Sequence, residues 1–298
     1  MKTISSSSRL FFLIITVVAL LSLEANAIRL YFNDNSTTQS LQNTSYPSHN
    51  IFISSGSTLQ LTNGATITAP SSVDDGESAI RIDDASFIGV NGTIIGGANF
   101  GGSGVTLSTS RDAKQGATAL FGSGMTVYGG DAARNETTQG GDAVQVLQSG
   151  SKATFAGGTI VAGRGCNPEV CGVSNNGNAI KVVMGEVIVK GGLFDGDFYN
   201  LQGSIQIHGC VEIVEIEEDG RRTTYIKGVL SDGSDIDVAY VGEENQLEIV
   251  QDDAACPSVP IAVDPSTSGA ELDSVGKKNS LVLVLASTVV SCLAVGWK

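Results

Sequence analysis

The sequence predicts an all-β fold made of short strands stacked on one another, and three observations predict it. Gly-Gly pairs recur at 96/97, 129/130, 157/158 and 191/192, spaced by 33, 28 and 34 residues, and units of about 20–50 residues are typical of repeat architectures. Between these pairs, apolar and polar residues alternate with the period of two that half-buried strands require. Aromatic residues make up only 6% of the chain and glycine occurs 37 times, which indicates a narrow interior filled mainly by Ala, Val, Ile and Ser.

The repeat itself excludes two other architectures. Strict alternation and frequent glycine contradict the 3.6-residue period of helical repeats, and a propeller blade needs about 40–45 residues, more than each unit holds. We therefore expect each strand to pair with its counterpart in the next repeat, about 4.8 Å away. The strands predicted most clearly begin at 79–82, 143–146 and 179–182, with looser copies at 58–61 and 105–107.

The pattern changes after Tyr199. Residues 211–218 form an alternating run, V-E-I-V-E-I-E-E, which is followed by Asp219-Gly220 and a further strand at 225–230. Asp-Gly between two such runs is a strong hairpin signal. We expect the last turns of the stack here, closed by a hairpin-like cap that covers the open end.

Two pairs of segments resemble a known superfold. They are Gly141-Asp-Ala-Val-Gln-Val146 with Phe155-Ala-Gly-Gly-Thr-Ile160, and Gly177-Asn-Ala-Ile-Lys-Val182 with 187–192. The stretch from about 51 to 250 resembles a right-handed parallel β-helix of the pectin-lyase-like type, similar in texture to surface adhesins and autotransporter passengers. The resemblance implies a single β-helix solenoid over 51–250, with an entry segment at 28–50 and a stalk at 251–268.

The first 27 residues have the features of a secretory signal peptide. A basic start is followed by an apolar run at 10–23 and by Ala25-Asn26-Ala27, the small-residue ending that signal peptidase cleaves. The alternative is an uncleaved membrane anchor, but the apolar run is short for a membrane span. We expect cleavage after Ala27 and entry into the secretory pathway.

The last 30 residues, 269–298, predict attachment to the outside of a cell. An 18-residue run of apolar and small residues at 280–297 follows the polar spacer 271–279, and small residues at 266–270 precede the spacer. This order is typical of a glycosylphosphatidylinositol (GPI) signal, with Ser268 as the candidate attachment site. The alternative is a single-pass helix, but Lys277 and Lys278 lie on its outer flank, against the positive-inside rule.

The charge balance restricts the partners. The chain has 17 Lys and Arg against 31 Asp and Glu, a net charge of −14. Without the two terminal segments, which hold three acids and five bases, residues 28–268 carry −16. Nucleic acid is therefore excluded as a partner, because phosphate binding needs clustered cations. The expected partners are an extracellular polysaccharide, the matrix or a surface protein, and the outer plasma membrane through the lipid anchor.

Four cysteines and four glycosylation sequons fit an oxidising compartment. With four cysteines, three pairings are open; one of them closes the short loop between the first two and joins the last two. The chain has only two histidines, so we expect no zinc site, and no cofactor. The cysteines are Cys166, Cys171, Cys210 and Cys256, and the sequon asparagines are Asn35, Asn43, Asn91 and Asn135.

Enzymes of the resembled superfold usually cleave polysaccharides, which requires converging carboxylates. The candidates are Asp83, Asp84, Asp195 and Asp197, and also Asp74 and Asp75. Each of these pairs adjoins a turn, where Asp is common for conformational reasons. The polygalacturonase-like motifs are missing, and the equivalent strand positions Arg81, Gln145 and Lys181 present cations and an amide instead of stacked acids.

We therefore expect a non-catalytic cell-surface glycoprotein for adhesion, wall or matrix organisation, or recognition. The alternative is a polysaccharide lyase or hydrolase. Acid-dense residues 232–237 lack the Asp-x-Asp-x-Asp-Gly calcium loop, so no metal ligand is assigned.

Overall fold

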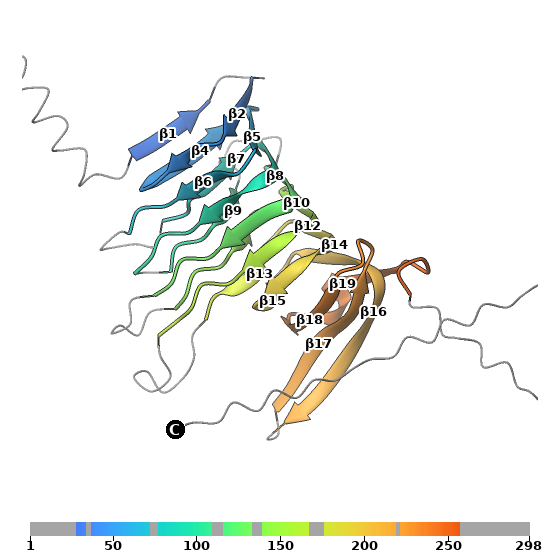
Figure 1. The fold of residues 1–298 in the computed structure, drawn as a ribbon. Helices are drawn as coiled ribbons and strands as arrows, with labels where there is room; N and C mark the ends of the chain where they lie inside the picture. Colours follow the sequence, from blue (N-terminus) through green and yellow to red (C-terminus); the bar gives the residue numbers. More distant parts are fainter. Residues whose placement is uncertain are drawn as a thin grey trace, which may run out of the picture. The chain divides into compact units, whose positions relative to one another are not determined.

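The computed structural model describes residues 28–33, 37–71, 77–99, 101–108, 116–132, 139–166, 176–218 and 221–256. The predicted signal peptide and the predicted GPI tail with Ser268 lie outside these residues. The described residues contain 19 strands and one short 3₁₀ helix (Figure 1). Their bounds are β1 Ile28–Phe32, β2 Thr38–Gln42, β3 Ser45–Tyr46, β4 His49–Ser54, β5 Thr58–Thr62, β6 Ala65–Thr68, β7 Ile80–Asp83, β8 Ser86–Ile95, β9 Val105–Ser108, β10 Thr118–Tyr128, β11 Val144–Val146, β12 Lys152–Val161, β13 Asn178–Val182, β14 Glu186–Asp195, β15 Asp197–Asn200, β16 Ser204–Glu218, β17 Arg221–Leu230, β18 Asp235–Val241, η1 Glu244–Gln246 and β19 Leu247–Gln251.

Parallel pairing dominates the sheet and follows three series of strands. The first series is β1, β4, β7, β9, β11, β13 and β15. The second runs from β2 through β5, the first part of β8, and then β10, β12, β14, β16 and β19. The third joins β3 and β6 to the later parts of β8, β10, β12 and β14. The strands expected at 79–82, 143–146 and 179–182 lie in the first series as β7, β11 and β13.

These pairings correct the predicted fold class. All 19 strands of the described ranges belong to one sheet, and β8 pairs with β5 through its first half and with β6 through its second. The sheet is large, mostly parallel and nearly closed into a barrel; it is not the right-handed parallel β-helix solenoid of the pectin-lyase-like type. The prediction was wrong because repeated alternating segments predict only that strands of successive repeats pair with each other. The bending and closure of the sheet depend on contacts between residues far apart in the sequence.

The C-terminal end of the sheet is antiparallel. The second half of β16 pairs with β17 from Gly209↔Leu230 to Glu218↔Arg221, and β17 pairs with β18. The hairpin expected across 219–220 is therefore present, and β17 and β18 are seen beside β16 at this end of the sheet in Figure 1. A disulfide between Cys210 and Cys256 ties the residues after β19 back to β16, as in one of the three pairings left open by the sequence.

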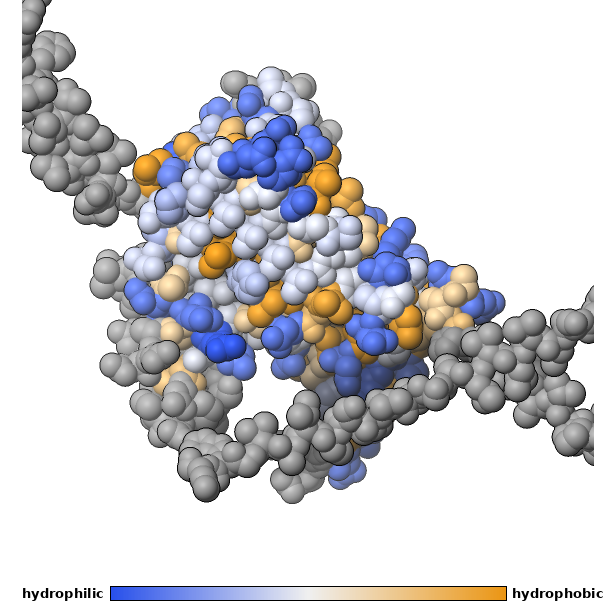
Figure 2. All heavy atoms as spheres, viewed as in Figure 1, coloured by the Kyte–Doolittle hydropathy of each residue, from blue (hydrophilic) through white to orange (hydrophobic). Residues whose placement is uncertain are grey.

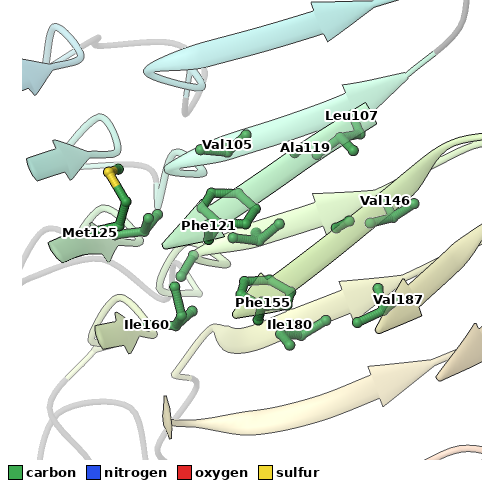
Figure 3. Close-up of a cluster of buried hydrophobic side chains, with 14 of the residues drawn as sticks. Val105, Leu107, Ala119, Phe121, Met125, Val146, Phe155, Ile160, Ile180 and Val187 are labelled. Carbon is green, nitrogen blue, oxygen red and sulfur yellow. The ribbon is translucent and has the colours of Figure 1, made fainter. Parts of the chain in front are cut away.

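The interior contains a column of phenylalanines that the composition did not predict. Consecutive ring centroids of Phe87, Phe121, Phe155, Phe194 and Phe198 lie between 4.8 and 5.7 Å apart. Figure 3 shows Phe121 and Phe155 among apolar side chains from neighbouring strands. Offset and edge-on ring contacts of this kind add stability beyond the area that they bury. The low aromatic content of the chain therefore coexists with an aromatic centre.

The Gly-Gly pairs have a packing role in addition to the expected turns. A Cβ atom at Gly130 would lie 2.0 Å from the carbonyl oxygen of Gly97, and one at Gly96 would lie 2.1 Å from that of Gly102. No side chain fits at such distances, so the connecting segments stack backbone on backbone. Left-handed backbone, the expected reason for glycine, applies at Gly158 and Gly192.

Candidate ligand-binding face

One row of side chains lies on the outer side of the first series of strands, and its members are exposed or partly exposed except Thr106, which is buried. Inward positions such as Ile51, Ile80 and Val144 are fully buried, and the residue that follows each of them points to the opposite side of the sheet. We call the outer surface of the first series the ladder face. Its central row, in register from strand to strand, is Tyr31, Phe52, Arg81, Thr106, Gln145, Lys181 and Tyr199.

The register confirms that Arg81, Gln145 and Lys181 occupy equivalent positions, since Thr106 connects Arg81 to Gln145 and Gln145 pairs with Lys181. The sequence patterns did not predict the aromatic ends of the row, Tyr31 and Tyr199. Tyr31 lies in the predicted entry segment, and alignment of 29–32 with 50–53 and 79–82 would have revealed it.

Aromatic rings form a platform at the N-terminal end of the ladder face. The rings of Tyr31 and Phe52 are stacked with centroids 5.1 Å apart and planes 18° from parallel. The guanidinium of Arg29 lies over Phe52, 6.0 Å from its centroid. Tyr31 is 62% exposed, so the outer side of the platform is accessible to a ligand.

A pocket of about 370 Å³ lies beside this platform, and its lining residues are Arg29, Asn50, Phe52, Glu77, Ser78 and Arg81. This volume is within the range of small-ligand sites, about 300–1,000 Å³. The lining joins an aromatic ring to two arginines, a carboxylate, an amide and a hydroxyl. It therefore has the mixture of apolar surface and convergent polar groups that is typical of binding sites.

Two ion pairs hold the arginines at the pocket. Arg29 Nη2 donates to Glu77 Oε1 at 3.0 Å, and Arg81 Nε donates to the carboxylate oxygens of Asp83 at 3.1 and 3.2 Å. The hydrogen bond to Glu77, and then its charge, raises the pKa of Arg29 above the ordinary value. Both arginines are half-exposed, so they remain accessible to an anionic group from solution.

Two acceptors at the pocket are buried without a hydrogen-bond partner among the described residues. Asn50 is only 1% exposed, and its Nδ2 donates to the carbonyl oxygen of Ser78 at 2.9 Å, but its Oδ1 accepts no hydrogen bond. Glu77 Oε2 is in the same condition. Buried acceptors without donors are uncommon because each loses its hydration. These two atoms are therefore hidden from solvent and unpaired among the described residues.

A second polar cluster lies toward the other end of the ladder face, around Asp142, which is 5% exposed. Its Oδ1 accepts from the backbone N and the Nδ2 of Asn178 at 2.8 and 2.6 Å. Its Oδ2 accepts from Gln145 Nε2 at 2.6 Å and lies 3.5 Å from Lys181 Nζ. The Lys181 ammonium also lies 6.0 Å from the ring centroid of Tyr199. In this cluster, both carboxylate oxygens have partners.

Of the six predicted carboxylates, Asp74 and Asp75 lie outside the described residues, and the other four are not assembled into one site. Asp83 is paired with Arg81 and accepts from Ser108 Oγ, and Asp84 follows it in a left-handed turn with φ 52°. Asp195 ends β14 and Asp197 begins β15, on either side of Gly196. Partial burial raises the pKa of Asp197. Four strand spacings separate Asp83 on β7 from Asp197 on β15, roughly 19 Å, whereas paired glycosidase carboxylates lie within about 9.5 Å.

The described residues include only some of the predicted glycosylation and disulfide sites. Asn43 and Asn91 are exposed, as glycosylation requires, whereas Asn35 and Asn135 lie outside the described residues. Cys166 is buried and disulfide-bonded. Cys171, its partner in the pairing that closes the short loop, lies outside the described residues.

Neither a metal site nor a membrane-spanning helix is found in the described part of the chain. No three His, Cys, Asp or Glu side chains there are grouped as metal ligands would be, and no described helix has the length and apolarity to cross a bilayer. On the face drawn in Figure 2, residues of intermediate hydropathy predominate and hydrophobic residues form small separate spots. That face lacks the large apolar patch typical of protein docking sites.

Comparisons with known proteins assign no relative. No family description, curated protein or solved structure matches the chain.

Proposed function

We propose that this protein is a non-catalytic extracellular module that binds a polysaccharide along the ladder face. The observation on which the proposal depends is the in-register row of aromatic, cationic and amide side chains from Tyr31 to Tyr199. Aromatic rings pack against the apolar faces of sugar rings, and charged and amide side chains bond hydroxyl groups. Both kinds of side chain recur on one surface here.

The dimensions of the row favour an extended polymer over an isolated small molecule. Six strand spacings separate Tyr31 from Tyr199, roughly 29 Å at about 4.8 Å per spacing. Repeated weak contacts along one chain add up through effective concentration. A ligand that itself repeats is therefore the best match to the row.

The electrostatics of the face support binding even though the predicted mature chain carries −16. The cations of the face are close to acids, as in the pairs Arg29–Glu77, Arg81–Asp83 and Lys181–Asp142. Long-range repulsion of an acidic polymer is screened within about 8–10 Å at physiological salt. A polysaccharide, neutral or acidic, can thus approach the ladder face.

The location that we propose is the outer surface of a eukaryotic cell. The support comes from the sequence: the signal-peptide pattern ending at Ala27, the GPI-type tail with Ser268, and the sequons. Release of the protein from intact cells by phosphatidylinositol-specific phospholipase C tests the lipid anchor. A known GPI-anchored protein on the same cells is the control for enzyme activity. If that control is released and this protein stays on the cells, the single-pass alternative is favoured.

A glycan array probed with the full chain, followed by calorimetry on the polymers that bind, tests the proposed function. The double variant Tyr31→Ala, Phe52→Ala should weaken binding by about five- to 150-fold, because it removes two stacking groups worth about 0.5–1.5 kcal/mol each beyond their area. Arg222→Gln, on β17 and outside the face, is the matched surface control. Absence of binding to every polysaccharide would contradict the proposal.

A polysaccharide-active enzyme is the alternative, and the raised pKa of Asp197 is the observation in its favour, since general acids need such a shift. Incubation with each bound polymer, with detection of new reducing ends and of unsaturated products, separates the two functions. Turnover that is lost in Asp197→Asn would replace the binding function by the enzymatic one.

A further inference from the structure

The second series of strands ends in two edges that lack a strand partner, one on β2 and one on β19. Within the described residues, β2 pairs only with β5, and β19 pairs only with β16. β2 lies at the end of the sheet that also holds β1 (Figure 1). The free side of such a strand presents backbone N–H and C=O groups on which a strand of another chain can pair, and native proteins usually protect it.

The β19 edge is protected by charge. Glu248 lies within the strand, and Asp252 and Asp253 follow it. Two copies of this edge would bring their acids close together, and like charges on paired strands are destabilising. The disulfide between Cys256 and Cys210 also fixes the residues after the strand to β16.

The β2 edge has no comparable protection in its own residues. Its sequence, Thr-Gln-Ser-Leu-Gln, contains neither a charged residue nor a proline, which are the residue types that commonly prevent edge pairing. Four of its five residues are exposed, and the fifth, Leu41, packs into the hydrophobic core. An identical strand from a second copy of the chain, related by a two-fold axis, therefore meets no charge repulsion at this edge.

A predicted glycosylation site adjoins the β2 edge. Asn43 is the residue directly after β2, and it is exposed. Its backbone is left-handed, with φ 47°, a conformation that Asn tolerates in turns. Ser45, the hydroxyl residue of the sequon, is exposed as well. The sequon is therefore accessible, and a carbohydrate attached to it lies at the corner between β2 and β3.

We propose that an N-glycan on Asn43 covers the β2 edge and prevents the protein from pairing with a second copy of itself. An N-glycan is bulky and hydrated, so it occupies the space that an added strand needs. At this end of the series, carbohydrate thus has the role that acidic side chains have at β19. The inference goes beyond the proposed binding function and shares with it only the secretory location.

The experiment compares the mass of the full chain with and without this N-glycan. The chain is produced in a eukaryotic host, and mass spectrometry of glycopeptides measures the occupancy of Asn43. Light scattering over a dilution series measures the polypeptide mass. Ser45→Ala removes the sequon and leaves Asn43 in place. We expect this variant to have twice the polypeptide mass of the monomeric wild type, because an uncovered edge pairs with its copy.

Three further variants assign the effect to the β2 edge. Ser45→Thr keeps the sequon and should remain a monomer. Asn91→Gln removes a sequon on β8, whose two edges are already paired, and should remain a monomer too. Gln39→Lys, added to Ser45→Ala, places a charge on β2 and should restore the monomer. Enzymatic deglycosylation of the folded wild type should also double the mass, and this measurement does not depend on the folding of a variant.

Several outcomes would overturn the inference. They are a monomeric Ser45→Ala variant, a wild type without carbohydrate on Asn43, and a dimer that persists when Gln39→Lys is added, since the association would then lie elsewhere. If Asn91 carries an N-glycan and Asn43 does not, this inference fails and the secretory location stands. If no sequon is modified, both fail.

Discussion

The two ends of the ladder face use similar chemistry in opposite ways. Each combines a carboxylate that precedes a strand with a cation and an amide from neighbouring parallel strands. Around Asp142, both carboxylate oxygens are occupied by Asn178, Gln145 and Lys181. Around Glu77, one carboxylate oxygen and the Asn50 carbonyl oxygen have no partner among the described residues. The first cluster is complete within the protein, whereas the second keeps unpaired acceptors beside an open pocket.

This difference has a physical meaning. A buried polar network in which every group is paired stabilises one conformation, and loss of one member exposes the desolvation cost of the rest. A site with unpaired buried acceptors has lost their hydration without gaining hydrogen bonds, so it contributes less to stability. Stability should therefore depend on the Asp142 end, and binding on the open pocket at the Asn50 end.

The largest expected effect is on stability at the complete end. Asp142→Ala leaves the donors of Asn178 and Gln145 without their acceptor and Lys181 without its counter-ion, and we expect a loss of about 2–4 kcal/mol in the free energy of unfolding. Equilibrium urea denaturation of the full chain measures it. A change below about 0.5 kcal/mol would show that the cluster is not structural.

At the open end, we expect a smaller loss of stability and a larger loss of binding. Asn50→Ala removes one hydrogen bond, to Ser78 O, and an acceptor that had no partner, so the loss should be about 1 kcal/mol. The same urea series measures stability, and titration with a bound glycan measures affinity. Equal destabilisation by Asn50→Ala and Asp142→Ala would remove the distinction between the two ends.

Replacing Glu77 sharpens the comparison because it removes only charge. Glu77→Gln breaks an ion pair with Arg29, whose side chain is 52% exposed, and exposed pairs contribute about 0–1 kcal/mol. We expect a stability change within that range, against a larger one for Asp142→Asn. Thermal denaturation of both variants at one salt concentration tests it, and a reversed order would contradict it.

The smallest expected effect is a pH dependence at Asp197, which pairs in register with Asn178. Burial raises its pKa in the folded protein above the ordinary value of 3.8, so the folded state holds the proton more tightly than the unfolded state. Stability from this group is therefore present below the unfolded pKa and is lost as the pH rises through the folded pKa.

The Asp197→Asn variant should not lose this stability between the unfolded and the folded pKa of Asp197. The free energy of unfolding of the variant relative to wild type should therefore rise with pH. Denaturation midpoints from pH 3 to pH 7 measure the difference. A difference that falls with rising pH would mean that Asp197 is stabilised in its charged form.

Part of this architecture could be predicted from sequence because it is local. Alternation placed the strands at 79–82, 143–146 and 179–182, the equivalence of Arg81, Gln145 and Lys181 followed from their repeats, and Asp219-Gly220 placed the hairpin between β16 and β17. The functional surface was harder to recognise. Its main pocket residues come from β1, β4 and the segment before β7, which share no conspicuous motif.

The sequence by itself determined that the chain is all-β, which residues alternate inward and outward, and that it carries the patterns of a secreted protein. Only the tertiary structure decided that one continuous sheet nearly closes around a phenylalanine column, that Cys210 joins Cys256, and that Arg29, Asn50 and Glu77 surround one pocket. The physical reason is range: side-chain alternation depends on neighbours two residues away, whereas closure and pocket formation depend on groups separated by whole strands, which meet only when the sheet has formed.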